Sequence, residues 1–382
     1  MKISQSRYLS ILFLYSCFQC ILLQFTLTQT DRMATWKHLA NTSIQRSSQT
    51  VSVISGHAFI YGGELRPREP VDSAMHRIPI MKRNFTKRTE KPTITTLHPS
   101  TVPTPRVGAA STTLNGKIYI FSGRGGTAMS PIEESGSFWV FDPSSSTSGS
   151  GSGSGNGNWS QVHPADPTRN HPSGRSYHAL ATNGRETIYL HAGCPETGRL
   201  SDLWAFNTHT REWTELPSAP GPARGGPSIA YVQDKIFRIN GFDGKTEQGG
   251  AIDVLDLAAG TGTWESIMYP ADGVSGPVPR SVACLVPVTV QGRVTLVTMF
   301  GEHDPSSLGH QGAGKMLADV WAFDVEGKKW EEVKVRGDDG GEQPVARGWL
   351  AANALSESGV IVHGGLAESN ERLGDIWRLD FA

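Results

Sequence analysis

Short apolar runs separated by turn residues recur along the chain from about residue 34 to its end. Within a run, apolar and polar positions alternate, which is typical of a strand with one side against a neighbouring sheet. Runs of one kind end in glycine, where the chain can turn with a positive φ and pack closely. Six such runs make an internal repeat. They are residues 59–63, 118–123, 188–193, 236–241, 297–301 and 360–365.

Each glycine-ended run has the same neighbours in the sequence. A strand with alternating aromatic residues and a nearby Asp follows it, and in four units a tryptophan then opens one more strand. A segment that begins with arginine precedes each run, and we call these segments the arginine loops. Their arginines are Arg46, Arg106, Arg175, Arg224, Arg280 and Arg347.

Every repeat therefore predicts four short antiparallel strands, and six repeats predict an all-β, six-bladed β-propeller. The last unit stops after Asp380 without its tryptophan strand, and the chain has an unpaired strand around Trp36 near its start. We expect this N-terminal Trp36 strand to complete the last blade and close the ring. The first unit deviates from the pattern, because 75–96 is basic and irregular, with no clear aromatic strand.

Two segments fall outside the repeat. Residues 1–32 form an apolar leader after a basic start, which predicts a signal peptide or an anchor. The alternative is that Met33 is the true start and the leader an artefact of the gene prediction. With either reading of the leader, we expect residues 34–382 to form the propeller. The Ser/Gly/Asn-rich run 144–158 is expected to be a solvated loop between the third and fourth strands of one blade.

Charge and cysteine content narrow the functional classes. The 35 Lys and Arg residues nearly balance the 36 Asp and Glu residues. The net charge of −1 therefore gives no reason to expect nucleic acid or an anionic membrane as the main partner. We expect membrane attachment only if the leader is retained. Cys194 and Cys284 are the only cysteines beyond the leader, which argues against a disulfide framework. We therefore expect a cytoplasmic protein, with secretion or anchoring through residues 1–30 as the alternative.

In an antiparallel blade, the loop between the second and third strands shares a face with the loop that enters the first. One rim of the propeller should therefore collect the residues after the glycine turns together with the arginine loops. An arginine that recurs in every unit is expected to tie blades together. Arg124 and Arg199 are different, because most units lack them, and two guanidiniums on one rim suit a sulfate or a carboxylate.

The loop 302–310 holds the densest set of metal-ligating residue types on this rim. Carboxylates with a histidine can bind Fe(II), Mn(II) or Zn(II) and leave positions open for substrate. Ordinary loop polarity is the alternative, since no helix or strand fixes the spacing. The residues are Glu302, His303, Asp304 and His310.

The repeat resembles the Kelch repeat, and several stretches resemble the Kelch specifier proteins of glucosinolate breakdown, namely the nitrile-specifier, epithiospecifier and thiocyanate-forming proteins. These stretches run through all six units. They are residues 60–64, 105–108, 174–178, 198–206, 223–227, 301–314, 346–349 and 369–377.

The resemblance implies a non-haem Fe(II) protein that redirects the aglucone released by myrosinase, a thiohydroximate-O-sulfate, to a nitrile. Glu302 and His310 match the ends of the family's iron-binding loop, whereas its middle aspartate is Ser306 here. Asp304 is the substitute carboxylate that we expect, so the predicted metal ligands are Glu302, Asp304 and His310. Arg124 and Arg199 match the family's sulfate-contacting arginines and are the predicted catalytic residues.

The expected partner is thus a small sulfated organic substrate. The main alternative is a non-catalytic Kelch propeller that binds another protein, because the fold does not determine the function. Copper chemistry like that of galactose oxidase is a third reading, but no matching Tyr/His set is evident in the sequence.

Overall fold

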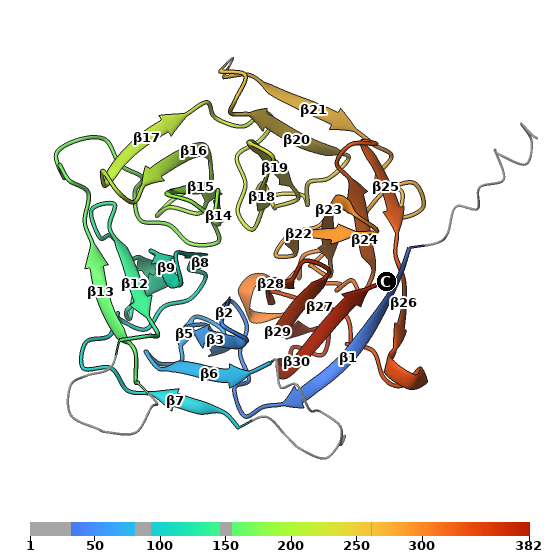
Figure 1. Cartoon of the computed structure of the whole chain (residues 1–382), viewed down its shortest axis with the longest axis horizontal. Coiled ribbons are helices and arrows are strands. Elements are labelled where there is room, and N and C mark those ends of the chain that lie inside the picture. Colours follow the sequence, from blue (N-terminus) through green and yellow to red (C-terminus); the bar gives the residue numbers. More distant parts are fainter. Residues whose placement is uncertain (1–31, 81–92, 146–154, 261) are drawn as a thin grey trace, which may run out of the picture. The chain divides into compact units, whose positions relative to one another are not determined.

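A computed structural model describes residues 32–80, 93–145, 155–260 and 262–382. The predicted leader is almost entirely outside these residues. Within Met33–Ala382 the chain forms six four-stranded antiparallel blades arranged in a ring (Figure 1). The all-β six-bladed propeller expected from the repeat is therefore confirmed.

The strands of a blade follow one another in the sequence, except that the last strand of blade 6 comes from the start of the chain. Blade 1 has β2 (Thr50–Ile54), β3 (His57–Tyr61), β6 (Met75–Pro79) and β7 (Thr95–Leu97); blade 2 has β8 (Ala110–Leu114), β9 (Lys117–Phe121), β12 (Phe138–Asp142) and β13 (Asn158–Val162); blade 3 has β14 (Ala179–Thr182), β15 (Thr187–Gly193), β16 (Leu200–Asn207) and β17 (Glu212–Leu216); blade 4 has β18 (Ser228–Val232), β19 (Lys235–Ile239), β20 (Ala251–Asp256) and β21 (Trp264–Met268); blade 5 has β22 (Cys284–Val290), β23 (Arg293–Met299), β24 (Val320–Asp324) and β25 (Lys329–Glu332); and blade 6 has β28 (Ala351–Ser356), β29 (Gly359–Ala367), β30 (Arg372–Phe381) and β1 (Met33–Asn41).

The ring closes as the orphan tryptophan strand predicted. β1 pairs antiparallel with β30, with Trp36 opposite Leu379. The Trp36 side chain is only 1% exposed and lies 5.7 Å from the ring of Phe300 in blade 5. The first and last described strands of the propeller are thus held in one sheet, against the neighbouring blade.

Blade 6 also carries a strand that the repeat did not predict. β26 (Lys334–Gly337), from the connection between blades 5 and 6, pairs in parallel with the outer side of β1. The other short elements are the ribbons β4 (Glu64–Arg66) with β5 (Glu69–Pro70) and β10 (Arg124–Gly125) with β11 (Ser130–Pro131), the strand β27 (Arg347–Gly348), and the 3₁₀ turns η1 (Gly309–Gln311) and η2 (Asp338–Gly340).

The first unit contains regular strands where the sequence looked irregular. Met75 and Ile78 of β6 are buried, so apolar alternation is present there without aromatic residues. His76, between them, lies within hydrogen-bonding distance of the Arg46 guanidinium (3.2 Å) and the Thr96 hydroxyl (3.1 Å). The basic residues 81–92 lie outside the described residues, as does most of the loop 144–158, at 146–154.

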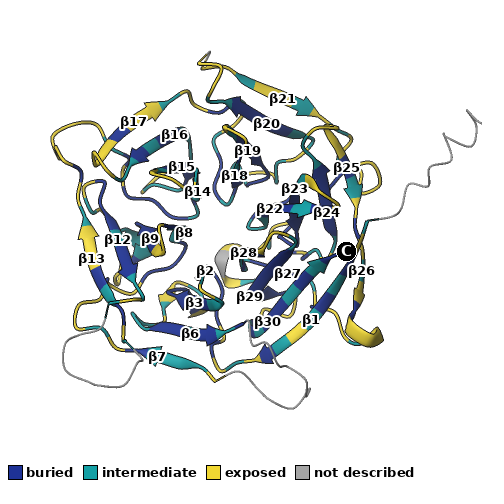
Figure 2. Ribbon diagram, viewed as in Figure 1, coloured by how far each residue is buried: buried dark blue, intermediate teal, exposed yellow. Residues whose placement is uncertain are grey.

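The hydrophobic core lies between blades, where neighbouring sheets face each other. Each of the six interfaces holds its own cluster of buried apolar side chains. For example, Phe59 of blade 1 packs at 5.9 Å against Phe141 of blade 2. Figure 2 shows the buried residues along the sheets and more exposed residues on the outer strands. Burial around a closed ring keeps the blades, and hence their loops, at fixed positions.

Candidate functional site

The rim forms as antiparallel geometry predicts. The residue after each glycine turn pairs with the residue that follows the loop arginine: Glu64 with Ser47, Arg124 with Val107, Cys194 with Ser176, Phe242 with Gly225, and Glu302 with Ser281. In blade 6 the equivalent pair is Gly348 with Leu366. We call this face, with its arginine loops and glycine turns, the rim.

Two closed rings of backbone hydrogen bonds stabilise the rim. In the outer ring, the turn glycine of each blade donates its N–H to the loop-arginine carbonyl of the next blade, at 2.8–3.0 Å. The inner ring joins the second residue after each loop arginine, at 2.7–3.0 Å: Ser48, Gly108, Tyr177, Gly226, Val282 and Trp349. All six inner residues have positive φ. That conformation is strained for Val282, so the surrounding structure must impose it.

The side chains of the loop arginines serve the fold. Arg280 is fully buried and donates two hydrogen bonds to Asp319, at 2.6 and 2.7 Å. Arg106, Arg175 and Arg347 pair in the same way with Glu134, Asp202 and Asp375. These carboxylates come from the same blade, whereas the arginine carbonyls bond to the neighbouring blade. The expectation that these arginines tie blades together thus holds for their backbone carbonyls, whereas the side chains of these four pair within their own blade.

Arg124 lies on the rim, but the protein occupies its donors. Its Nε donates to the Ser176 hydroxyl at 2.9 Å, one terminal nitrogen donates to the Met129 carbonyl at 3.0 Å, and the other donates to the Pro195 carbonyl. The guanidinium therefore joins blade 2 to the Cys194–Pro195 segment of blade 3.

Arg199 has free hydrogen-bonding capacity. Its guanidinium lies 5.1 Å from the centre of the Phe242 ring, a cation–π contact with blade 4. Within the described part of the chain its Nε is buried without a hydrogen-bond partner. Gly244 permits this position, because a Cβ there would lie 2.8 Å from a terminal nitrogen of Arg199.

The two predicted sulfate-binding arginines both lie near Cys194. Burial raises the pKa of the Cys194 thiol, and the positive charges of Arg199 and Arg124 partly oppose the rise. A Cβ at Gly225 would lie 2.4 Å from the Cys194 sulfur and 3.9 Å from Nε of Arg199. The structure thus brings both arginines to one sector of the rim, over blades 2 to 4.

Glu302 is the buried residue of the predicted metal loop. It is 6% exposed, and its Oε1 accepts a 2.9 Å hydrogen bond from the Gly314 N–H. Burial raises the pKa of Glu302, and the Gly314 hydrogen bond opposes the rise. Gly314 has to be glycine, because a Cβ there would lie 2.5 Å from that oxygen and 2.2 Å from the Asp304 carbonyl.

The other predicted ligands do not join Glu302 in the described structure. The Asp304 side chain is 74% exposed and lies 3.7 Å from the His303 ring. The Ser306 hydroxyl accepts a 3.2 Å hydrogen bond from the Leu308 N–H within its own loop. His310 belongs to η1, and its side chain lies outside the described structure. Among described side chains, no three His, Cys, Asp or Glu residues are grouped to hold a metal.

Sequence reasoning missed Glu247, in the β19–β20 loop. Its backbone pairs with Phe242, and both carboxyl oxygens are buried without a hydrogen-bond partner among the described residues. Burial raises its pKa to about 8, with Ser281 and Arg199 opposing the rise and the Glu302 and Asp243 charges adding to it. In the sequence, 243–247 reads as a polar turn, and Asp243 does cap one by accepting from the Lys245 and Thr246 N–H groups. The sequence pattern gives no sign that the Glu247 carboxyl is buried, because its burial depends on the packing of the folded chain.

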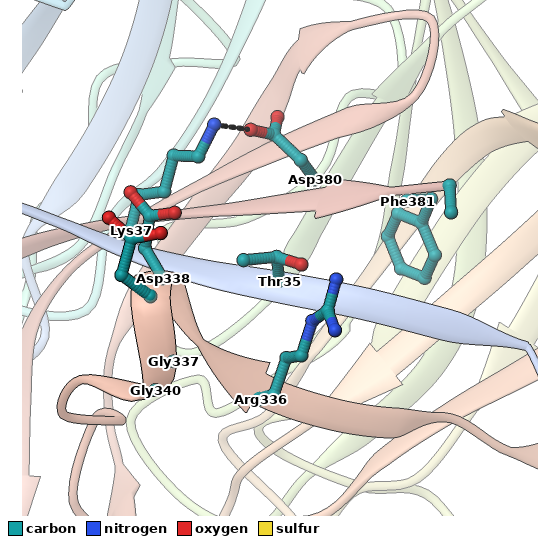
Figure 3. Close-up of a pocket in the computed structure, with 10 residues that line it drawn as sticks. Thr35, Lys37, Arg336, Gly337, Asp338, Gly340, Asp380 and Phe381 are labelled. Carbon is teal, nitrogen blue, oxygen red and sulfur yellow. Dashed lines mark ion pairs between the residues drawn. The ribbon is translucent and has the colours of Figure 1, made fainter.

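Two cavities lie apart from these residues. One of about 120 Å³ lies on the propeller axis, where the rings of Tyr177 and Trp349 meet edge to face at 5.1 Å. The other, of about 390 Å³, is at the outer edge of blade 6, between β1, β26 and the C-terminus. Figure 3 shows its Lys37–Asp380 ion pair, with Arg336 and Asp338 beside it.

Comparison with known proteins identifies the family. The profile of the KLHDC2/KLHL20/DRC7 Kelch-repeats domain matches residues 48–301, well over half of the chain. This chain belongs to the Kelch-repeat family. It is 24% identical over 356 residues to the N-(sulfonatooxy)prop-2-enimidothioate sulfolyase of Thlaspi arvense, covering 87% of this chain and 91% of the Thlaspi protein. The resemblance to the specifier-like Kelch proteins is therefore supported.

Two further likenesses concern the Kelch repeats alone. Kelch domain-containing protein 10 of Rattus norvegicus is 24% identical over 169 residues, which is 42% of this chain and 37% of that protein. The solved structure of YjhT superposes with a TM-score of 0.62 at 17% identity, over 88% of this chain and 95% of YjhT. In the part of this chain that the structure describes, no helix is long and apolar enough to span a membrane.

Proposed function

We propose that this Kelch propeller is a specifier-type protein that uses Fe(II) to direct thiohydroximate-O-sulfate aglucones, released by myrosinase, to nitriles. The name of the Thlaspi relative supports this, because it describes a sulfolyase acting on a compound of this class. One observation in this chain carries the proposal. Arg199 lies over Phe242 with its Nε lacking a hydrogen-bond partner among the described residues, and a sulfate is an anion that a guanidinium binds well.

The two arginines take different parts in this proposal. Arg199 would donate hydrogen bonds to the sulfate and stabilise it as it leaves. Arg124 already donates to Ser176, Met129 and Pro195, so it positions the segment that leads to Arg199 and adds its charge to the same sector. Two positive charges near one leaving group favour charge that develops on the sulfate oxygens.

The reaction balances without an external oxidant. The N–O bond breaks and sulfate leaves with the electron pair, while the C–S bond breaks to give sulfur and the C≡N group. The thiohydroximate sulfur is oxidised as the nitrogen is reduced, and the thiol proton leaves with the sulfate. The protein then has to favour this fragmentation over rearrangement to the isothiocyanate.

The fit of the chain to Fe(II) is partial. Glu302 suits a ligand, because its carboxylate is buried, is oriented by Gly314 and is of a type that Fe(II) accepts. Asp304, in its described position, does not suit one, because its side chain faces solvent. His310, predicted as the third ligand, remains part of the proposal. We also propose a cytoplasmic location, from the sparse cysteines.

Product analysis tests this function. The purified full chain, with Fe(II), is added to a glucosinolate and myrosinase, and the nitrile and isothiocyanate are measured by gas chromatography. We expect the nitrile fraction to rise with the amount of chain added. An unchanged product mixture would contradict the proposal and favour the alternative, a Kelch propeller that binds a protein partner.

A further inference from the structure

The carboxyl group of Glu247 is an unexplained buried acid on the rim. Both of its oxygens are buried without a close hydrogen bond among the described residues, and the Ser281 hydroxyl is the donor that acts on them. A buried polar group without a partner is costly, so it is retained where a ligand, a proton or an ion satisfies it. The Ser281 hydroxyl opposes the rise in the Glu247 pKa, and the positive charge of Arg199 opposes it less.

Backbone hydrogen bonds bring Glu247 and Glu302 to the same part of the rim. The residue after Glu247, Gln248, accepts the N–H of Arg280 at 3.3 Å. The residue after Arg280, Ser281, exchanges two backbone hydrogen bonds with Glu302, at 2.9 and 3.0 Å. The negative charge of Glu302 reaches Glu247 and raises its pKa, in agreement with this placement.

One carboxylate oxygen of Glu302 lacks a hydrogen bond among the described residues. Its Oε1 accepts the Gly314 N–H, and Oε2 has no hydrogen bond with any described residue. The segment that should supply the second carboxylate faces elsewhere, because Asp304 is largely exposed and Ser306 bonds to Leu308. The buried carboxyl group whose pKa responds to the Glu302 charge therefore comes from blade 4.

We propose that Glu247 and Glu302 are the carboxylate pair of a divalent-cation site on the rim, with Glu247 in the role expected of Asp304. Carboxylate oxygens suit Fe(II) and Mn(II), and a cation would relieve the repulsion between the two acids. The positive charge of Arg199 acts on Glu247, so an anion held by the guanidinium would lie near the cation. This inference rests on the proposed function only for the choice of Fe(II).

Metal binding by the full chain tests the pair directly. Anaerobic equilibrium dialysis with Fe(II), and separately with Mn(II), compares the wild type with Glu247→Gln and with Asp304→Asn. Both substitutions remove one carboxylate and keep the side-chain size. We expect Glu247→Gln to weaken binding at least tenfold and Asp304→Asn to change it less than twofold.

Thermal unfolding provides a second readout and a check on folding. Glu247→Gln removes a buried acid and keeps a group that the Ser281 hydroxyl can reach, so the variant should melt at or above the wild-type temperature without metal. Mn(II) should raise the melting temperature of the wild type but not of this variant. Loss of binding in Asp304→Asn but not in Glu247→Gln would overturn the inference and leave the proposed Fe(II) function standing. A wild type that binds neither metal would also overturn it, while the product assay decides the specifier activity separately.

Discussion

Arginines of this chain have different roles that depend on their local partners. Arg280 is buried against Asp319, all three nitrogens of Arg124 donate to carbonyl or hydroxyl acceptors, and Arg199 has a buried Nε without a partner above Phe242. A guanidinium without an acceptor is the one able to take an external anion. The hydrogen-bond partners of an arginine, and not its residue type, therefore indicate whether it can bind a ligand.

The buried pairs of the arginine loops should dominate stability. Replacing Asp319 with Ala leaves Arg280 buried without its carboxylate, and we expect a loss of about 3–5 kcal/mol in the free energy of unfolding. The matched control is Glu265→Ala, which breaks an exposed pair with Lys328 and should cost about 1 kcal/mol or less. Urea unfolding measures both losses. Equal losses would show that the buried pair contributes no more to the free energy of unfolding than the exposed pair.

At the residue scale, the sequence identified the site arginines but could not rank them. Arg124 and Arg199 both follow the resemblance, yet the acceptors of Arg124 are backbone carbonyls of Met129 and Pro195, which no motif encodes. Glu247 was missed for a related reason, since a polar turn gives no sign of which side chain points inward. Burial of a single side chain depends on the packing of the neighbouring blade.

The blade is the element in which sequence and structure agree most closely. Outside β6 and β7 of the first unit, alternation, glycine turns and the orphan Trp36 strand were sufficient to predict the blade strands and the closure, because each reflects local backbone geometry. β26 was not predictable in the same way. Its pairing with β1 depends on where the connection between blades 5 and 6 passes, not on its own pattern.

Ring closure should depend on Trp36. Its side chain is buried against Phe300 and Trp377, so Trp36→Ala should lower the free energy of unfolding by about 3–5 kcal/mol. Val274→Ala, at a position that is 81% exposed, should change it by about 0.5 kcal/mol or less. If urea unfolding gave the same midpoint for the Trp36 variant and the wild type, the N-terminal strand would not hold the ring.

The metal loop should be sensitive to Gly314. A methyl group there overlaps the Glu302 carboxylate and the Asp304 carbonyl, so Gly314→Ala should displace Glu302 and weaken Fe(II) binding roughly tenfold, the effect expected when a supporting contact of a ligand is lost. Ser307→Ala, at an exposed position of the same loop, is the control and should bind as the wild type does. Equal dialysis curves for the two variants would exclude Glu302 from the site.

At the scale of the whole molecule, two closed rings of backbone hydrogen bonds and six apolar interfaces make the propeller a rigid support. Residues that form the proposed site come from blades 3, 4 and 5, yet each is held by this common frame. The arrangement suits a site that binds a preformed reactive substrate and orients its fragmentation.

Buried histidines should make this frame sensitive to acid. Burial lowers the pKa of His178 and His363 to about 3 and that of His191 well below its usual value. In the unfolded chain these histidines bind a proton near pH 6.5, whereas in the native chain they stay neutral. Their contribution to the free energy of unfolding is therefore fully present above pH 6.5 and is lost as the pH falls toward 3. Each histidine contributes about 1.4 kcal/mol per pH unit in this window. Urea midpoints measured from pH 7 to 4.5 should fall steadily, and a flat profile would contradict the neutral, buried assignment.

The most direct test of the central claim, that Arg199 on the rim serves a specifier-type reaction, is the product ratio of an Arg199 variant. Arg199→Ala removes the unpaired guanidinium, and Arg185→Ala removes an exposed one from the same blade as a control. Loss of charge-assisted hydrogen bonds to sulfate should lower nitrile formation roughly tenfold or more in the first variant and leave the second unchanged. Equal nitrile formation by the wild type and Arg199→Ala would contradict the account.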